Sequence, residues 1–167
     1  AGEYPDGHTH FLTRTLRPMG LRCLGSMTVD DRREDMSSAL RFASESAQLI
    51  IITGGLGPTD NDVTRETLEA FTGIPLKEHP DVLAAMEQRL NTPRDQLRSN
   101  LRKQSRVPVG GTYLRNSNGT AVGLVFEMAD KVIVALPGPP RELEPMVKEE
   151  LVPYLGRRFK THPPGCS

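Results

Sequence analysis

A run of four aliphatic residues, 49–52 (LIII), stops at the glycine-rich segment 54–59 (GGLGPT), and this junction sets the fold class. An uninterrupted aliphatic run of this kind indicates a strand buried on both faces, which is typical of parallel sheets. The composition of residues 54–59 predicts a loop, and residues 62–71 have the apolar spacing of a helix. The junction therefore predicts a buried strand, a glycine-rich turn and a helix in succession.

The rest of the chain repeats this alternation of strands and helices. We expect further strands over residues 21–29, 113–114, 121–126 and 132–136. We expect further helices over residues 10–19, 36–43, 80–90, 93–102 and 139–151. This alternation predicts a layered α/β domain. The last two strands are separated by a short turn and predict one hairpin near the C-terminal end.

Length and composition limit the class of protein. The 167 residues fit one domain, which we expect over residues 1–160, followed by a loose tail over residues 161–167. The 21 basic residues balance the 21 acidic ones, whereas a dedicated nucleic-acid binder usually carries a basic excess. No apolar stretch approaches the roughly 20 residues that span a bilayer. Cys23 and Cys166 have no metal or redox spacing, and no export signal is visible. We therefore expect a cytoplasmic protein without nucleic-acid or membrane partners.

The glycine-rich loop is the first candidate for chemistry. Ligands of open α/β sheets bind outside the carboxyl ends of the strands, where this loop is expected to lie. Gly54, Gly55 and Gly57 allow the backbone to approach a phosphate, and the start of the next helix adds N–H donors. Pro58 and Thr59 complete the candidate phosphate-binding loop. The spacing is that of neither the dinucleotide fingerprint nor the P-loop, so a simple tight turn remains the alternative.

Acidic residues follow this loop and suggest a metal ion. Asp60 and Asp62 would repel a phosphate unless a cation lies between them, and Mg²⁺ is commonly held by carboxylates together with substrate phosphates. Asp31 ends a different predicted strand and can face the same edge of the sheet. The alternative is structural, because Asp31 and Asp62 are also good helix caps and Asp60 suits a solvated turn.

Three smaller features carry weaker signals. Residues 136–140 (LPGPP) also follow a buried strand, and Gly138 permits close approach of a ligand or of another backbone. Lys103 can reach a phosphate, or it belongs to a solvated basic helix face. His8 and His10 lack a third ligand, so we expect them on the surface.

Taken together, four stretches resemble the N-terminal domain of the CinA (competence/damage-inducible) family, which is part of the wider molybdopterin-binding superfamily. The stretches are Asp31 with the helix after it, residues 54–64, Lys103-Gln104 with Pro108 and residues 116–123 (NSNGTAVG), and residues 136–146 (LPGPPRELEPM). The resemblance runs from about residue 2 to residue 154. The family normally begins with an aliphatic strand before the first matched residues, so we expect further residues to precede this sequence.

The resemblance implies a three-layer α/β/α sandwich with a mostly parallel central sheet. It also implies a ligand cleft at the strand ends, with Lys103 and Asn116 as further ligand-binding candidates. The residues expected to line the cleft are Asp31, Gly54, Gly55, Gly57, Asp60, Asp62 and Gly138.

Proteins of this family are associated with metal-dependent cleavage of the pyrophosphate in ADP-ribose, and their molybdopterin relatives adenylylate a pterin. We therefore expect a domain that binds a nucleotide pyrophosphate and hydrolyses ADP-ribose, with no organic cofactor. Asp31 and Asp62 are the expected catalytic residues, which with Asp60 would hold Mg²⁺, Co²⁺, Ni²⁺ or Mn²⁺. The alternatives are a molybdopterin adenylyltransferase-like enzyme and a non-catalytic module that binds an adenine nucleotide or a pterin. We also expect that the protein can form a homodimer or a homotrimer.

Overall fold

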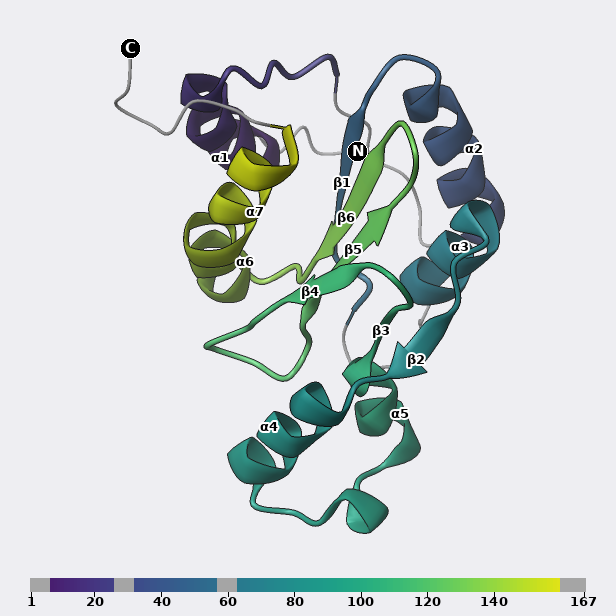
Figure 1. The fold of residues 1–167 in the computed structure, drawn as a ribbon, viewed down its shortest axis with the longest axis vertical. Helices are drawn as coiled ribbons and strands as arrows, with labels where there is room; N and C mark the ends of the chain where they lie inside the picture. Colours follow the sequence, from purple (N-terminus) through teal and green to yellow (C-terminus); the bar gives the residue numbers. More distant parts are fainter. Residues whose placement is uncertain (1–6, 26–31, 57–62, 160–167) are drawn as a thin grey trace.

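The computed structural model describes residues 7–25, 32–56 and 63–159 of the chain, which form helical layers around a central sheet (Figure 1). The α-helices are α1 (Gly7–Leu16), α2 (Arg33–Ser44), α3 (Val63–Thr72), α4 (Pro80–Leu90), α5 (Ser99–Arg102), α6 (Pro140–Met146) and α7 (Val152–Phe159). The 3-10 turns are η1 (Arg17–Met19), η2 (Arg94–Gln96) and η3 (Lys103–Ser105), and η4 (Val147–Leu151) is π-helical. The strands are β1 (Leu49–Thr53), β2 (Leu76–Glu78), β3 (Arg106–Pro108), β4 (Thr112–Leu114), β5 (Gly123–Glu127) and β6 (Val132–Leu136).

The central sheet has the strand order β1-β6-β5-β4. Strands β1 and β6 are parallel, with Thr53 opposite Leu136 at their carboxyl ends. Strand β5 is antiparallel to both β6 and β4, so the described sheet is mixed. The N–H of Met128 donates to the carbonyl of Lys131 at 2.9 Å and closes the turn between β5 and β6. This pair confirms the hairpin expected near the C-terminal end.

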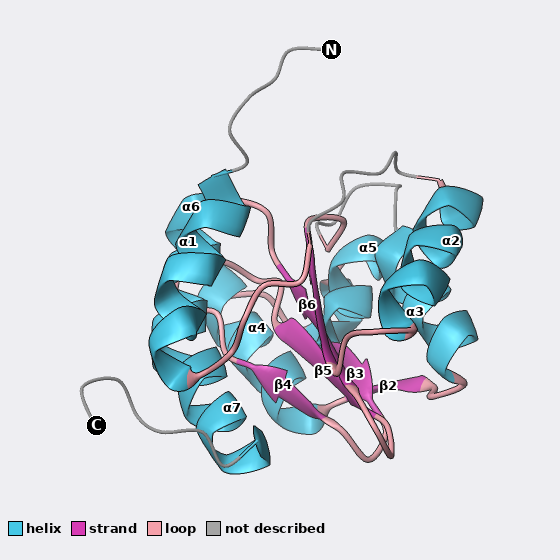
Figure 2. Cartoon of the chain, turned by 90° about the horizontal axis from the view of Figure 1, so that it is seen from above, coloured by secondary structure: helices cyan, strands magenta, loops and turns pink. Residues whose placement is uncertain are grey.

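Strand β6 shows why the central strands are apolar without interruption. All five of its residues are fully buried. Val132, Val134 and Leu136 join the cluster formed with α1, α6 and α7, whereas Ile133 and Ala135 join the cluster formed with α2 and α3. Alternate side chains of a strand point to opposite faces, so helices on both sides demand an apolar residue at every position. Figure 2 shows these helices on the two sides of the sheet and confirms the three-layer sandwich.

The strand predicted over residues 21–29 is wrong in its described part. Residues 21–25 form neither helix nor strand, and residues 26–29 lie outside the described residues. Gly20 adopts a φ of +86° and ends η1, and Leu24 beyond it is 57% exposed. Because no neighbouring strand pairs with residues 21–25 among the described residues, their backbone gains no sheet hydrogen bonds.

The single helix predicted over residues 93–102 is also wrong. Leu97 and Arg98 are extended, with ψ values of 137° and 144°, and they separate η2 from α5. Leu97 and Leu101 are its only aliphatic residues, too few to give a continuous helix a buried face. Strand β3 follows η3 and pairs antiparallel with β2, and sequence analysis did not predict this sheet of two three-residue strands.

Strands β2 and β3, with α4 and α5, form a smaller lobe at one end of the central sheet (Figure 1). The N–H of His79, which precedes α4, donates to the carbonyl of Ser105 at 2.8 Å. Helix α4 buries Val82, Leu83 and Met86. The predicted tail, residues 161–167, lies outside the described residues. Within the described ranges, no helix has the length and apolar character needed to cross a membrane.

The two-sided core makes one testable prediction. Phe126 on β5 is fully buried, so Phe126→Ala should lower the free energy of unfolding by about 3–5 kcal/mol, measured by urea denaturation. Phe42→Ala is the matched control because Phe42 is 66% exposed on α2, and its change should stay within about 0.5 kcal/mol. Equal losses for the two variants would contradict the assignment of β5 to the core.

Candidate functional site

Two glycines turn the chain at the carboxyl end of β1. Gly54 and Gly55 have φ values of +92° and +74°, which residues with a side chain rarely adopt. The N–H of Gly54 donates to the carbonyl of Leu136 at 2.9 Å, so the ladder between β1 and β6 extends into the turn. A Cβ atom at Gly55 would overlap the hydroxyl of Thr64 on α3. Backbone conformation and space therefore both require glycine at position 55.

The carbonyl groups of this turn point into the protein. The Thr64 hydroxyl donates to the Gly54 carbonyl at 3.3 Å. The Leu56 carbonyl accepts hydrogen bonds from the Arg65 guanidinium and the Gln104 amide, both at 3.0 Å. Gly55 is exposed, and among the described residues no group accepts a hydrogen bond from its N–H. Carbonyls turned inward beside an exposed N–H leave a surface whose dipoles favour an anion.

The turn after β6 packs against this first turn. A Cβ atom added to Gly138 would lie 3.5 Å from the Cα atom of Gly54. Because β1 and β6 are parallel, their carboxyl ends bring Gly54, Gly55 and Gly138 together, and we call this place the glycine edge. The structure thus places three of the predicted ligand residues side by side, while their role in binding stays a prediction.

His8 on α1 reaches the glycine edge from the opposite helical layer. Its Nε2 atom donates to the Gly138 carbonyl at 2.7 Å, which requires the proton on Nε2. His8 is half-buried rather than on the surface, so the sequence-based expectation for it was wrong. A lone histidine 130 residues from its partner carries no local signal that could have revealed the contact.

The predicted ligand residue Asn116 is engaged within the protein. Its side-chain amide donates to the Ala121 carbonyl and to the Glu142 carboxylate, each at 2.8 Å, and its Oδ1 accepts from the N–H of Asn118 at 2.9 Å. These contacts use both N–H donors of the amide. Asn116 therefore holds the loop over residues 115–120 against the first turn of α6.

Asn118 replaces a hydrogen bond that proline removes from α6. Pro145 has no N–H, so it cannot donate to the Arg141 carbonyl four residues earlier in the helix. The Asn118 side-chain amide donates to that carbonyl at 2.7 Å instead. The loop thus satisfies a backbone acceptor that the helix leaves open.

The start of the same loop is fixed by an ion pair. The backbone N–H and the guanidinium Nε of Arg115 donate to Oε1 of Glu150 on η4, at 2.9 and 3.2 Å. Burial raises the pKa of the Glu150 carboxyl, but the N–H and the guanidinium of Arg115 together outweigh it, so this pKa lies below its ordinary value. The carboxylate stays ionised at neutral pH and holds the loop.

Lys103 lies half-buried in η3. Its neighbour Gln104, which the sequence analysis named in the family resemblance without a role in the site, contacts the glycine turn. Six of the predicted site residues lie outside the described residues: Asp31, Gly57, Pro58, Thr59, Asp60 and Asp62. Within the described part of the chain, no group of three or more His, Cys, Asp or Glu side chains could hold a metal ion. The metal site and the two catalytic aspartates therefore stay predictions.

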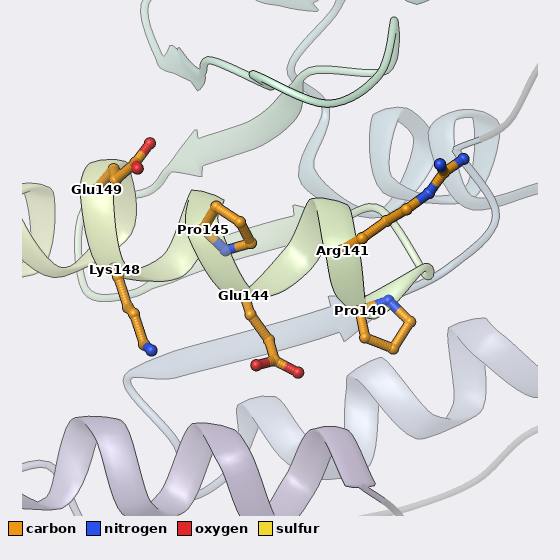
Figure 3. Close-up of a pocket in the computed structure, with 6 residues that line it drawn as sticks. All are labelled: Pro140, Arg141, Glu144, Pro145, Lys148 and Glu149. Carbon is orange, nitrogen blue, oxygen red and sulfur yellow. The ribbon is translucent and has the colours of Figure 1, made fainter.

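Two open hollows of the described surface lie elsewhere. One, of about 450 Å³, follows α6 and η4, and Figure 3 shows Glu144 and Lys148 directed toward α1. There the Lys148 ammonium lies 5.7 Å from the ring centroid of Phe11. The other, of about 500 Å³, is lined by Arg14 and Arg17 among others on α1 and η1. Neither hollow includes a residue of the glycine turn, so neither replaces the glycine edge as the candidate site.

The geometry of Gly55 leads to a second prediction. Gly55→Ala should lower the free energy of unfolding by about 2 kcal/mol or more, from the left-handed backbone and the overlap with Thr64. Thermal and urea unfolding would measure the loss. Gly25→Ala is the control, because nothing lies within 4 Å of a Cβ atom there. If Gly55→Ala were as stable as Gly25→Ala, the turn would not have this conformation.

The contact between Asn118 and α6 leads to a third prediction. Asn118→Ala should cost about 1 kcal/mol of unfolding free energy by removing the donor to the Arg141 carbonyl. In a Pro145→Ala background the restored helical N–H can satisfy that carbonyl, so the cost should fall toward zero. A double-mutant cycle by urea denaturation would measure this coupling. The same cost in both backgrounds would show that the contact does not compensate for the proline.

Comparison with known families matches residues 1–157 to the family described as "Probable molybdopterin binding domain". Similar curated proteins carry the name competence-damage inducible protein. One from Caldicellulosiruptor bescii is 35% identical over 159 residues, and one from Symbiobacterium thermophilum is 37% identical over 163 residues. The alignments cover 95% and 97% of this chain but 39% and 38% of these relatives. The chain therefore spans less than two fifths of the length of the curated relatives it matches.

Solved structures agree with this assignment. The CinA protein with unknown function from Thermoplasma acidophilum is 26% identical with a TM-score of 0.81, covering 95% of this chain and 89% of that one. A molybdenum cofactor biosynthesis protein B shares the fold, with 21% identity, a TM-score of 0.59 and coverage of 96% and 88%. The resemblance to CinA proteins that the four sequence stretches indicated is confirmed. The chain belongs to the molybdopterin-binding domain family.

Proposed function

We propose that this chain binds the pyrophosphate of a nucleotide-type ligand at the glycine edge and hydrolyses it, with ADP-ribose as the first substrate to test. The observation that carries the proposal is the turn in which the Gly54 and Leu56 carbonyls accept from side chains of the protein. The trans peptide between Gly54 and Gly55 therefore directs the Gly55 N–H away from Thr64, opposite to the Gly54 carbonyl. A phosphate oxygen that accepted from this N–H would meet no opposing carbonyl of Gly54 or Leu56. Membership of a family described by pterin binding supports a small-molecule ligand of this kind.

In the proposed reaction, water attacks one phosphorus of the pyrophosphate and the bond from that phosphorus to the bridging oxygen breaks. The products from ADP-ribose are AMP and ribose 5-phosphate. Asp31 and Asp62 are the proposed catalytic carboxylates, and together with Asp60 they are the groups that would hold Mg²⁺, Mn²⁺, Co²⁺ or Ni²⁺. A divalent cation there would neutralise charge on the phosphates. The backbone donors of the glycine edge would orient the pyrophosphate.

The proposal predicts metal-dependent release of AMP from ADP-ribose, followed by chromatography with each of the four metals and with a chelator. Asp62→Asn should lower turnover by about 100-fold or more by removing a charge beside the phosphates, with the melting temperature retained. Asp95→Asn is the matched control, because Asp95 is exposed on η2 in the smaller lobe. An Asp62→Asn variant as active as wild type would remove Asp62 from the reaction.

A second candidate function is adenylyl transfer to a pterin, favoured by the description of the matched family. It predicts ATP consumption that depends on an added pterin and no release of AMP from ADP-ribose alone. A third outcome is a binding module, in which ADP-ribose raises the melting temperature by roughly RT ln(1 + [L]/Kd) in free energy while no product forms. The same set of incubations distinguishes these functions.

A further inference from the structure

We infer that Gln104 is a positioning residue for the glycine turn, oriented by Thr120 so that its amide keeps the Leu56 carbonyl turned away from the ligand. This inference rests on the proposed function, because it assigns a cause to the anion-binding shape of the turn. Gln104 comes from η3, 48 residues further along the chain than Leu56. The smaller lobe that contains η3 thereby contributes to the conformation of the glycine edge.

The hydrogen bonds fix which end of the amide faces the turn. The Thr120 hydroxyl donates to Oε1 of Gln104 at 2.6 Å, and Nε2 of Gln104 donates to the Leu56 carbonyl at 3.0 Å. If the amide were reversed, its oxygen would face the Leu56 carbonyl oxygen, and two acceptors would meet without a proton between them. The Leu56 carbonyl, which can only accept, therefore selects the orientation in which Gln104 is a donor to the turn, and the Thr120 hydroxyl holds the amide oxygen in that orientation.

Burial makes this arrangement hard to replace with water. Gln104 and Leu56 are each 1% exposed, and Arg65 is 3% exposed. A buried carbonyl that loses a partner is costly, and hydrogen bonds are stronger where water is excluded. The Arg65 guanidinium also donates to this carbonyl, at 3.0 Å from α3. The Leu56 carbonyl is thus held between two donors from separate elements, which fixes its direction.

This restraint has a consequence for an anion at the glycine edge. A carbonyl oxygen carries partial negative charge, and a carbonyl that turned outward would repel the phosphate oxygens beside the Gly55 N–H. With Gln104 removed, Arg65 alone would restrain the carbonyl, so the turn would populate conformations that bind phosphate less well. The loss should therefore appear in ligand affinity even where the domain remains folded.

The test compares variants of both residues by isothermal titration with ADP-ribose and with inorganic pyrophosphate, each with Mg²⁺, well below the melting temperature. All proteins carry Asp62→Asn, so that the proposed hydrolysis does not occur during the titration. Gln104→Met removes the donor at similar size and should weaken binding about tenfold, the contribution of about one buried hydrogen bond. Thr120→Val removes the hydroxyl and should weaken binding by a smaller factor, whereas Thr120→Ser should restore wild-type affinity. Gln96→Met is the control, because Gln96 is exposed on η2.

A second measurement does not depend on the ligand. Amide hydrogen exchange at Gly54 and Leu56, followed by NMR, should be faster in Gln104→Met and Thr120→Val than in wild type and Thr120→Ser. Wild-type exchange at these amides in both variants, with unchanged affinity, would overturn the positioning role. If wild-type protein bound neither probe, the proposed function would fail. The exchange measurement would then still decide the role of Gln104, and Thr120→Val serves if Gln104→Met does not fold.

Discussion

The parallel pairing of β1 with β6 is the constraint on which the site depends. It sets Thr53 opposite Leu136, so that both strands end at the same level and their turns leave the sheet together. The hydrogen bond from the Gly54 N–H to the Leu136 carbonyl continues this register past the end of β1. Without it Gly138 would not lie against Gly54, and the exposed Gly55 N–H would belong to an isolated turn. The site is thus a consequence of register and of the apolar core that maintains it.

Around this edge, side chains complete backbone groups that secondary structure leaves open. Asn118 supplies the donor that Pro145 cannot give to the Arg141 carbonyl, and Gln104 shares the Leu56 carbonyl with Arg65. In both cases an amide from a distant segment satisfies an acceptor in a turn or helix. The Leu56 carbonyl is buried and would be costly to leave without a partner, so Gln104 and Arg65 fix its direction. Asn118 and Gln104 therefore act on the shape of the loops around the site.

Sequence patterns predicted what is local and missed what is distant. The uninterrupted apolar residues of β6 predicted a strand buried on both faces, and the glycines after β1 predicted a turn. Both predictions were possible because each pattern lies within a few neighbouring residues. Gln104 contacts a residue 48 positions away and His8 contacts one 130 positions away in the sequence. Sequence periodicity cannot predict contacts between such distant residues. Asn116 was expected at the ligand, but its amide is used by the Ala121 carbonyl and by Glu142. The prediction of one helix over residues 93–102 was wrong because a few apolar residues at helical spacing do not give a helix enough apolar surface to bury.

Charge supports the proposal of a cation at the glycine edge. Asp60 and Asp62 follow Gly55 by five and seven residues in the sequence. The Arg65 guanidinium is buried and donates to the Leu56 carbonyl, which ties its charge to the protein side of the turn. In the proposed site, a pyrophosphate bound beside Asp60 and Asp62 would meet like charge. Backbone dipoles of the glycine turn are weak against several full charges, so a divalent cation between the carboxylates and the ligand is the simplest way to bind it.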